Sequence, residues 1–174
     1  ETEGKVDFTN GFTEVYGDPL GLKASWEGYV NYTDHQATRR AQTLSRNAQW
    51  FEDHSPVDAR FRKPLCRGVS AKVINAAILG GDLYPSSAIG INLPNSNWVR
   101  AEYGSKSVTI ANLTHAYDEA ARGNGFRNEF ADSPQTVSLM DQYGSICDDL
   151  HTDLHECLGH GSGRLLPGVD PDAL

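Results

Sequence analysis

His155-Glu-Cys-Leu-Gly-His160 is the segment around which the rest of this chain can be understood. It lies near the end of the sequence, within residues 150–163, with a histidine at each end and a glutamate directly after the first histidine. Neutral imidazoles bind divalent metal ions, and a neighbouring carboxylate can accept a proton from a water molecule. These residue types predict a metal site of the kind found in zinc hydrolases, with His155 and His160 as ligands and Glu156 as general base.

The two histidines are five positions apart, one more than in the short motif that a straight helix offers to zinc. At 3.6 residues per turn, side chains five positions apart point roughly 140° away from each other. A single π-turn would absorb the extra residue and bring the imidazoles together. Gly159, directly before the second histidine, is the expected place for this distortion because glycine tolerates unusual backbone angles.

A second histidine pair competes with this one. His151 and His155 are four positions apart, which is the spacing that an undistorted helix presents to a metal ion. From the residues alone, either pair can be the metal-binding pair. Asp148, Asp149 and Asp153 lie nearby, and one of them can orient a ligand imidazole by accepting its second N–H. A solvated acidic helix face is an equally good interpretation of these carboxylates.

Periodicity and turn residues predict an α+β fold, with mixed helices and a small β-sheet. The expected strands cover residues 12–16, 25–31, 69–79 and 89–93, and the alanines leave a short helix as the alternative at 69–79. The expected helices cover residues 33–51, 108–122 and 134–160. Thr33 is the expected N-cap of the first helix, with Gln36 completing a capping box. Ser133 followed by Pro134 predicts the start of the last helix, which carries the histidine motif at its C-terminal end. Residues 1–10 and 52–68 are expected to be lead-in and connector.

The length and the amino-acid composition are those of an ordinary globular protein. It has 174 residues, 39% of them hydrophobic and 22% charged, which is enough for one domain with a core. The net charge of −8 argues against nucleic acid and anionic membranes as partners. No apolar run approaches the roughly 18 residues that a membrane span requires.

The cysteines favour a reducing compartment. Cys66, Cys147 and Cys157 are widely spaced and odd in number, with neither a disulfide framework nor a Cys-x-x-Cys zinc motif. We expect reduced, buried thiols in a cytoplasmic protein. Cys157 occupies a variable position of the histidine motif and is expected to pack in the core. The chain does not begin with Met, and we interpret it as a piece of a longer protein.

Three stretches together resemble the dipeptidyl peptidase III family of zinc exopeptidases. They are the HExxGH string at residues 155–160, Gly11-Phe-Thr-Glu-Val-Tyr-Gly-Asp-Pro-Leu-Gly21 and Gly90-Ile-Asn-Leu-Pro-Asn95, and the resemblance covers nearly the whole chain. It implies that Zn²⁺ binds His155 and His160, which leaves His151 as a packing or supporting residue. The family's third zinc ligand comes from a later Glu-Glu-x-Arg-Ala-Glu/Asp motif, which is not present in residues 1–174.

The resemblance also implies substrate-binding residues. Glu14 would bind the free N-terminus of a peptide, and Tyr16 would polarise the scissile carbonyl. Asn92 and Asn95 would hold the peptide N-terminus and backbone, and Gly90 would permit a close backbone approach. Without the resemblance, an ordinary exposed Glu14 and a packing Tyr16 are the better interpretation. Asn95, beside Pro94, can also be a turn residue.

The family architecture implies two lobes on either side of a cleft. Strands near residues 11–31 and 73–95 would belong to the lower lobe, and the helix at 134–160 would belong to the upper lobe. The implied function is a zinc-dependent exopeptidase that releases dipeptides from the N-terminus of short peptides. Residues 1–174 alone are expected to be weakly active or inactive because the third ligand is missing. A non-catalytic peptide-binding relative and a different zinc hydrolase that shares only the helix motif are the alternatives.

Overall fold

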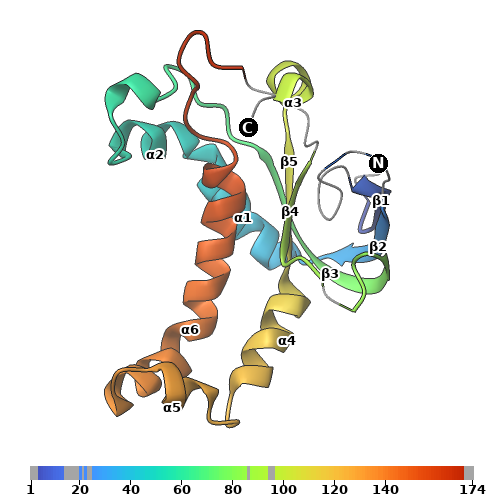
Figure 1. The fold of residues 1–174 in the computed structure, drawn as a ribbon, viewed down its shortest axis with the longest axis vertical. Coiled ribbons are helices and arrows are strands. Elements are labelled where there is room, and N and C mark those ends of the chain that lie inside the picture. Colours follow the sequence, from blue (N-terminus) through green and yellow to red (C-terminus); the bar gives the residue numbers. More distant parts are fainter. Residues whose placement is uncertain are drawn as a thin grey trace.

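The computed structural model describes residues 4–13, 20, 22, 25–85, 87–93 and 97–170. Its centre is a curled five-stranded sheet with strand order β1-β2-β3-β5-β4 (Figure 1). The strands are β1 (Val6–Thr13), β2 (Ser25–Thr33), β3 (Ser70–Gly81), β4 (Gly90–Leu93) and β5 (Lys106–Ile110). All neighbouring pairs are antiparallel except β3 and β5, which are parallel. The α+β fold class predicted from the sequence is confirmed.

The helices lie beside the sheet and beyond one end of it (Figure 1). They are α1 (His35–Arg46), α2 (Ala48–His54), the short η1 (Ala59–Phe61), α3 (Asn97–Tyr103), α4 (Ala111–Ala121), α5 (Phe126–Phe130), α6 (Pro134–Leu154) and the π-helical turn η2 (His155–Gly159). Ser133 caps α6 by accepting the backbone N–H of Thr136, and Pro134 occupies the first turn, as the sequence predicts. The end of α6 that carries η2 lies beside the sheet, while α4, α5 and the start of α6 extend away from it.

Two apolar clusters stabilise this arrangement. The first lies on the sheet and contains Tyr29, Ile74, Leu83, Val108 and Ile110. The second joins α1, β3 and η2 through Ala41, Val69, Ala71, Val73 and Cys157. Burial of such side chains stabilises the fold by roughly 25 cal/mol for each Å² of apolar surface removed from water. The π-turn is therefore anchored in the core by Cys157, whose expected packing role is confirmed.

The N-terminal part of the chain differs from the expectation. Residues 6–10 were expected to be lead-in, but they form most of β1, in which Val6 pairs with Tyr32 at the far end of β2. Cross-strand pairing makes a strand of this polar segment although its local composition does not indicate one. The part of the expected strand beyond Thr13 lies outside the described residues.

The predicted helix over residues 33–51 is wrong in two details. Thr33 remains in β2, and Asp34 is the N-cap, with its side chain accepting the N–H groups of Gln36 and Ala37. The carboxylate accepts hydrogen bonds from two backbone N–H groups of the first helical turn, which have no partner inside the helix. The predicted hydroxyl cap would satisfy fewer of these N–H groups. The helix also breaks at Asn47, so α1 and α2 are separate.

The predicted helix over residues 108–122 begins too early, because residues 106–110 form β5. Val108 and Ile110 point into the sheet cluster, while Ser107 and Thr109 alternate with them and are also buried. Both faces of this strand are covered, so its apolar periodicity is incomplete and the sequence alone does not distinguish it from a helix. The short helices α3 and α5 were not predicted.

Two further expectations concern the surface. Cys66 and Cys157 are buried free thiols as predicted, but Cys147 is exposed on α6, contrary to the prediction. Within the described residues, no helix is both long enough and apolar enough to span a lipid bilayer. The assignment of the strands and of the last helix to two separate lobes stays a prediction.

Candidate metal centre

The predicted π-turn is present at the histidine motif. The backbone N–H of His160 donates to the carbonyl oxygen of His155 at 3.1 Å, which is the five-residue step of a π-helix. The two imidazoles consequently approach each other, with ring centroids 4.8 Å apart and planes at 87°. Gly159 lies inside this turn, as expected. The π-turn therefore brings the two rings together although the histidines are five positions apart.

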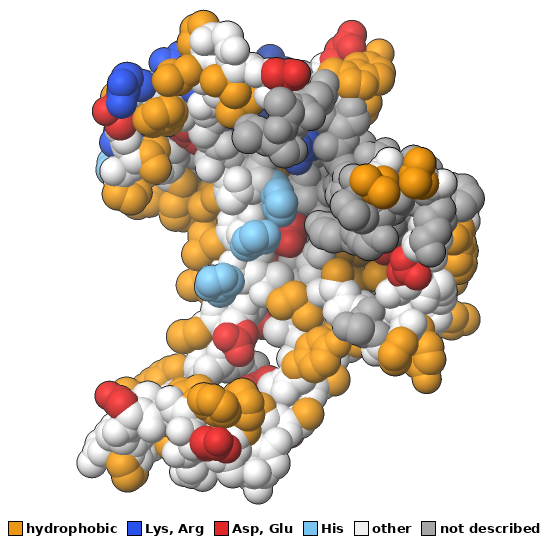
Figure 2. All heavy atoms as spheres, in the orientation of Figure 1, with side chains coloured by type: hydrophobic (Ala, Val, Ile, Leu, Met, Phe, Trp, Pro, Cys, Tyr) orange, Lys and Arg blue, Asp and Glu red, His pale blue; other side chains and the backbone are white. Residues whose placement is uncertain are grey.

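His155, Glu156 and His160 each offer a ligand atom, and these atoms all lie within 4.8 Å of one another. Both histidines face solvent, whereas Glu156 is buried. His151 is also exposed, but it does not belong to this group. Figure 2 shows histidine side chains gathered on one face of the molecule. The tertiary structure thus places His155 and His160 in one group with Glu156 and leaves His151 outside it.

Glu156 is a carboxylate in an unusual environment. It is only 5% exposed, and Oε2 has no hydrogen-bond partner among the described residues. This oxygen lies 3.9 Å from Nε2 of His160. Burial raises the pKa of Glu156 to about 7, because a charged carboxylate loses its hydration. A buried acceptor without a partner is the kind of group that a metal-held water or an ion completes.

The histidines also fit a metal. Burial, with a smaller contribution from the charges of His155 and Arg100, lowers the pKa of His160. A neutral imidazole is the form that ligates a cation. Two imidazoles beside an orphaned carboxylate oxygen therefore fit a divalent metal.

Strand β4 passes directly over the Glu156 carboxylate. A Cβ atom built on Gly90 would lie 2.3 Å from Oε1 of Glu156, so any larger side chain at residue 90 would have to displace the carboxylate or the strand. Asn92, two residues along the same strand, is buried and donates from Nδ2 to Oγ of Ser107 at 2.6 Å. The structure therefore brings Gly90 and Asn92 to the site. The other predicted substrate-binding residues, Glu14, Tyr16 and Asn95, lie outside the described residues, and their roles stay predictions.

Two hydroxyls on β5 bind the metal-bearing helix. Ser107 Oγ donates to the backbone carbonyl of Glu156 at 2.7 Å, and Thr109 Oγ1 donates to Oδ1 of Asp153 at 3.2 Å. Neither residue is among the site residues predicted from the sequence: Thr109 falls inside the helix expected over residues 108–122, and Ser107 directly precedes it. Their spacing of two, which puts them on one face of a strand, is the signal that would have found them.

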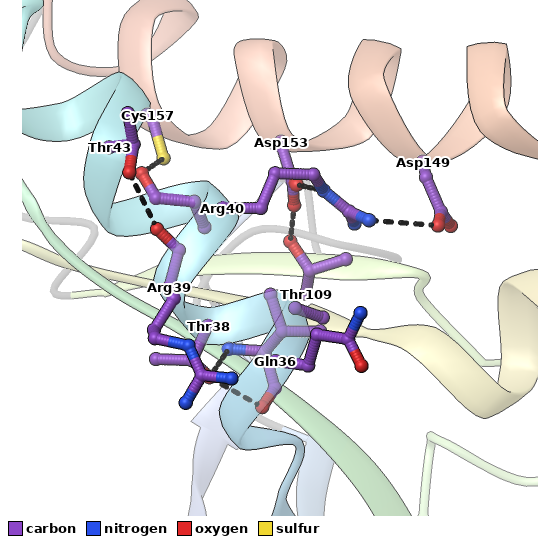
Figure 3. A network of polar contacts seen from close by, with 12 residues as sticks. Gln36, Thr38, Arg39, Arg40, Thr43, Thr109, Asp149, Asp153 and Cys157 are labelled. Atoms are coloured by element: carbon purple, nitrogen blue, oxygen red, sulfur yellow. Dashed lines mark hydrogen bonds and ion pairs between the residues drawn. The ribbon is translucent and has the colours of Figure 1, made fainter.

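An arginine on α1 completes this contact (Figure 3). Arg40 Nε donates to Oδ2 of Asp153 at 2.7 Å, and its Nη1 lies 3.3 Å from Oδ2 of Asp149. Asp153 is fully buried, so it does not lie on a solvated helix face. Its carboxylate binds Arg40 and Thr109, and not a histidine ring as the other prediction had it. Asp148 is exposed. The buried network holds α6 against α1 and β5 just before the π-turn.

A cavity of about 1040 Å³ opens beside His160. Its lining comes from the connector before β3, from α3 and the turn after it, and from the segment after the π-turn. The charged lining residues are Lys63, Arg67, Arg100, Glu102 and Arg164. The metal centre therefore adjoins a space that can hold more than a single small ligand.

Comparison with known proteins identifies the family to which this fold and site correspond. The model of peptidase family M49 matches residues 1–174, and the chain belongs to this family. Membership implies a metal cofactor. The resemblance found in the three sequence motifs is thus confirmed.

Individual relatives agree with this assignment. The chain is 31% identical over 163 residues to dipeptidyl peptidase 3 of Dictyostelium discoideum, which covers 92% of this chain and 22% of that protein. The structure of DPP III from Caldithrix abyssi matches 94% of this chain and 30% of that chain, with a TM-score of 0.74 and 24% identity, and shows that the fold is shared. Dipeptidyl-peptidase III from Corallococcus sp. strain EGB matches 67% of this chain and 22% of that chain, with a TM-score of 0.57 and 31% identity. The chain spans about a fifth of the length of the curated relatives it matches.

Proposed function

We propose that this chain carries part of the active site of a zinc-dependent exopeptidase that releases dipeptides from the N-terminus of short peptides. The observation that carries the proposal is the π-turn that gathers His155, Glu156 and His160. The chain's membership of a peptidase family supports peptide-bond hydrolysis as the reaction class. The names of its relatives, dipeptidyl peptidase 3, support the release of dipeptides.

Zinc is the metal that suits these donors best. His155 and His160 would hold it, since imidazole nitrogens are preferred zinc ligands and burial lowers the pKa of His160, which favours the neutral ring that binds a metal. When bound, such an ion lowers the pKa of a coordinated water and polarises a carbonyl. The third protein ligand implied by the family resemblance is not part of residues 1–174, so we expect these residues alone to bind zinc weakly.

Glu156 is the proposed general base. Its pKa of about 7 lies near neutral pH, where a carboxylate can both accept and return a proton. It would take the proton of the attacking water and pass it to the leaving amine nitrogen. Gly90 supports this role by leaving space for the carboxylate next to β4.

Strand β4 is the proposed binding surface for the peptide. It is the last strand in the sheet order of the described residues, so its outer edge offers backbone groups to an extended peptide. Oδ1 of Asn92 is buried and has no partner among the described residues, which makes it an available acceptor for the N–H groups of a peptide N-terminus. Glu14, Tyr16 and Asn95 remain in the proposal with the roles that the family resemblance implies.

The test compares one peptide with a free N-terminus and the same peptide acetylated. Products are identified by mass spectrometry, with zinc supplied, for residues 1–174 and for the longest polypeptide that contains them. We expect dipeptide release from the free peptide by the longer protein, weak or no turnover by residues 1–174, and a loss of about 10²–10⁴-fold in Glu156→Gln. Equal cleavage of the acetylated peptide would indicate a different zinc hydrolase. Binding without cleavage by the longer protein would indicate a non-catalytic relative.

A further inference from the structure

Two buried hydroxyls of β5 contact the metal-bearing helix, but at different kinds of atom. Thr109 donates to a side-chain carboxylate one turn before the motif, at Asp153. Ser107 donates to the main chain inside the π-turn, at the carbonyl oxygen of Glu156. Ser107 is 2% exposed, so this contact is shielded from solvent. Only Ser107 therefore acts directly on the distorted turn.

The π-turn leaves the Glu156 carbonyl without its usual helical partner. In an α-helix this oxygen would accept the N–H of residue 160, and in a π-helix the N–H of residue 161. Here the N–H of His160 goes to His155, and the N–H of Gly161 goes to Leu158. Buried carbonyls need a partner, and the Ser107 hydroxyl supplies it at 2.7 Å.

The same hydroxyl determines which way the Asn92 amide faces. A serine has one O–H to donate, and Ser107 uses it on Glu156. Its oxygen can then only accept from Asn92, so the NH₂ group of Asn92 must point to Ser107, at 2.6 Å. The amide oxygen Oδ1 is consequently left as a buried acceptor without a partner among the described residues.

We propose that Ser107 is a positioning residue with two effects: it holds the π-turn that brings the metal ligands together, and it orients Asn92 so that its oxygen is available to a substrate N–H. Its importance for metal binding and catalysis rests on the proposed function, whereas its hold on the π-turn is a property of the fold. The influence of Ser107 on the two histidine rings passes through the Glu156 backbone.

The test compares Ser107→Ala with Thr109→Val as matched control, because each variant deletes one buried β5 hydroxyl bonded to the same helix. Amide hydrogen exchange of His160 is measured in metal-free residues 1–174, and the zinc dissociation constant is measured alongside. We expect Ser107→Ala to accelerate exchange at His160 about tenfold or more relative to Thr109→Val and to weaken zinc binding roughly 10–100-fold. Ser107→Thr, which keeps the hydroxyl, should restore both properties. In the longer protein, Ser107→Ala should also raise KM for free peptides more than Thr109→Val does.

Equal exchange rates at His160 in the alanine and valine variants would overturn the proposal, because the π-turn would then not depend on this hydroxyl. Unchanged zinc affinity in Ser107→Ala, with a wild-type chain that binds zinc, would overturn it as well. If the wild-type chain binds no zinc, the proposed metal site fails, while the exchange measurement still decides the role of Ser107.

Discussion

Glu156 and Gly90 lie so close that a Cβ atom on residue 90 would be 2.3 Å from Oε1 and 2.8 Å from Cδ of the glutamate. The two residues come from different elements, the π-turn and strand β4. Real Cβ atoms do not tolerate such distances, so either the strand or the carboxylate would have to move. This contact links the proposed general base directly to the proposed substrate-binding strand.

Gly90→Ala should displace the Glu156 carboxylate. We expect a loss of about 1–3 kcal/mol in the free energy of unfolding from overpacking. In the longer protein, peptide hydrolysis should fall about 100-fold, since a displacement near 1 Å has this effect on a catalytic group. Gly11→Ala on β1 is the matched control, because its Cβ would meet nothing within 4 Å. Equal effects of the two substitutions, by urea unfolding and initial rates, would refute the steric explanation.

Stability should depend on pH through Glu156. Its pKa is raised from 4.5 to about 7 by burial, so between these values the folded chain binds a proton that the unfolded chain has lost. The free energy of unfolding should therefore fall as pH rises from about 4.5 to 7, by about 3 kcal/mol relative to Glu156→Gln.

Urea unfolding at several pH values in the presence of a chelator measures this difference. The lowered pKa of His160 has the opposite sign and favours the folded chain as pH rises. Because both proteins retain His160, its contribution cancels in the comparison. Parallel pH profiles for wild type and Glu156→Gln would show that Glu156 titrates normally.

Arg40→Met should be strongly destabilising. It removes the guanidinium that faces the fully buried carboxylate of Asp153, and an unpaired buried charge costs about 3–5 kcal/mol. Arg39→Met is the control, because Arg39 is exposed on the same helix. Replacing both partners, as Arg40→Met with Asp153→Leu, should recover much of the loss since no buried charge remains. A similar free energy of unfolding for the Arg40 and Arg39 variants would contradict this account.

Zinc binding should distinguish the two histidine pairs. His155→Ala and His160→Ala each remove a proposed ligand and should weaken zinc binding beyond the roughly 100-fold that loss of a supporting partner costs. His151→Ala should leave the dissociation constant within about threefold, because His151 is not in the cluster around Glu156. Equal losses in His151→Ala and His155→Ala, with binding retained in His160→Ala, would place the metal on the straight-helix pair.

Local sequence alone determined the features that depend on neighbours along the chain. The spacing of His155 and His160 implies a π-turn, because no straight helix can direct both rings to one ion. Ser133 and Pro134 mark the start of α6 through chemistry confined to one helical turn. The strand at residues 70–81 was recognisable from its apolar side chains.

Tertiary structure decided the features that depend on residues far apart in sequence. Residues 106–110 became a strand because they pair with β3 and β4, and no local pattern indicates those partners. Ser107 meets Glu156 across 49 positions, and Arg40 meets Asp153 across 113. Such contacts follow from how the helix packs on the sheet and on α1, which the order of residues does not reveal locally. The candidate metal ligands could therefore be proposed from the motif, whereas the groups that hold the motif in place emerged only when the chain folded.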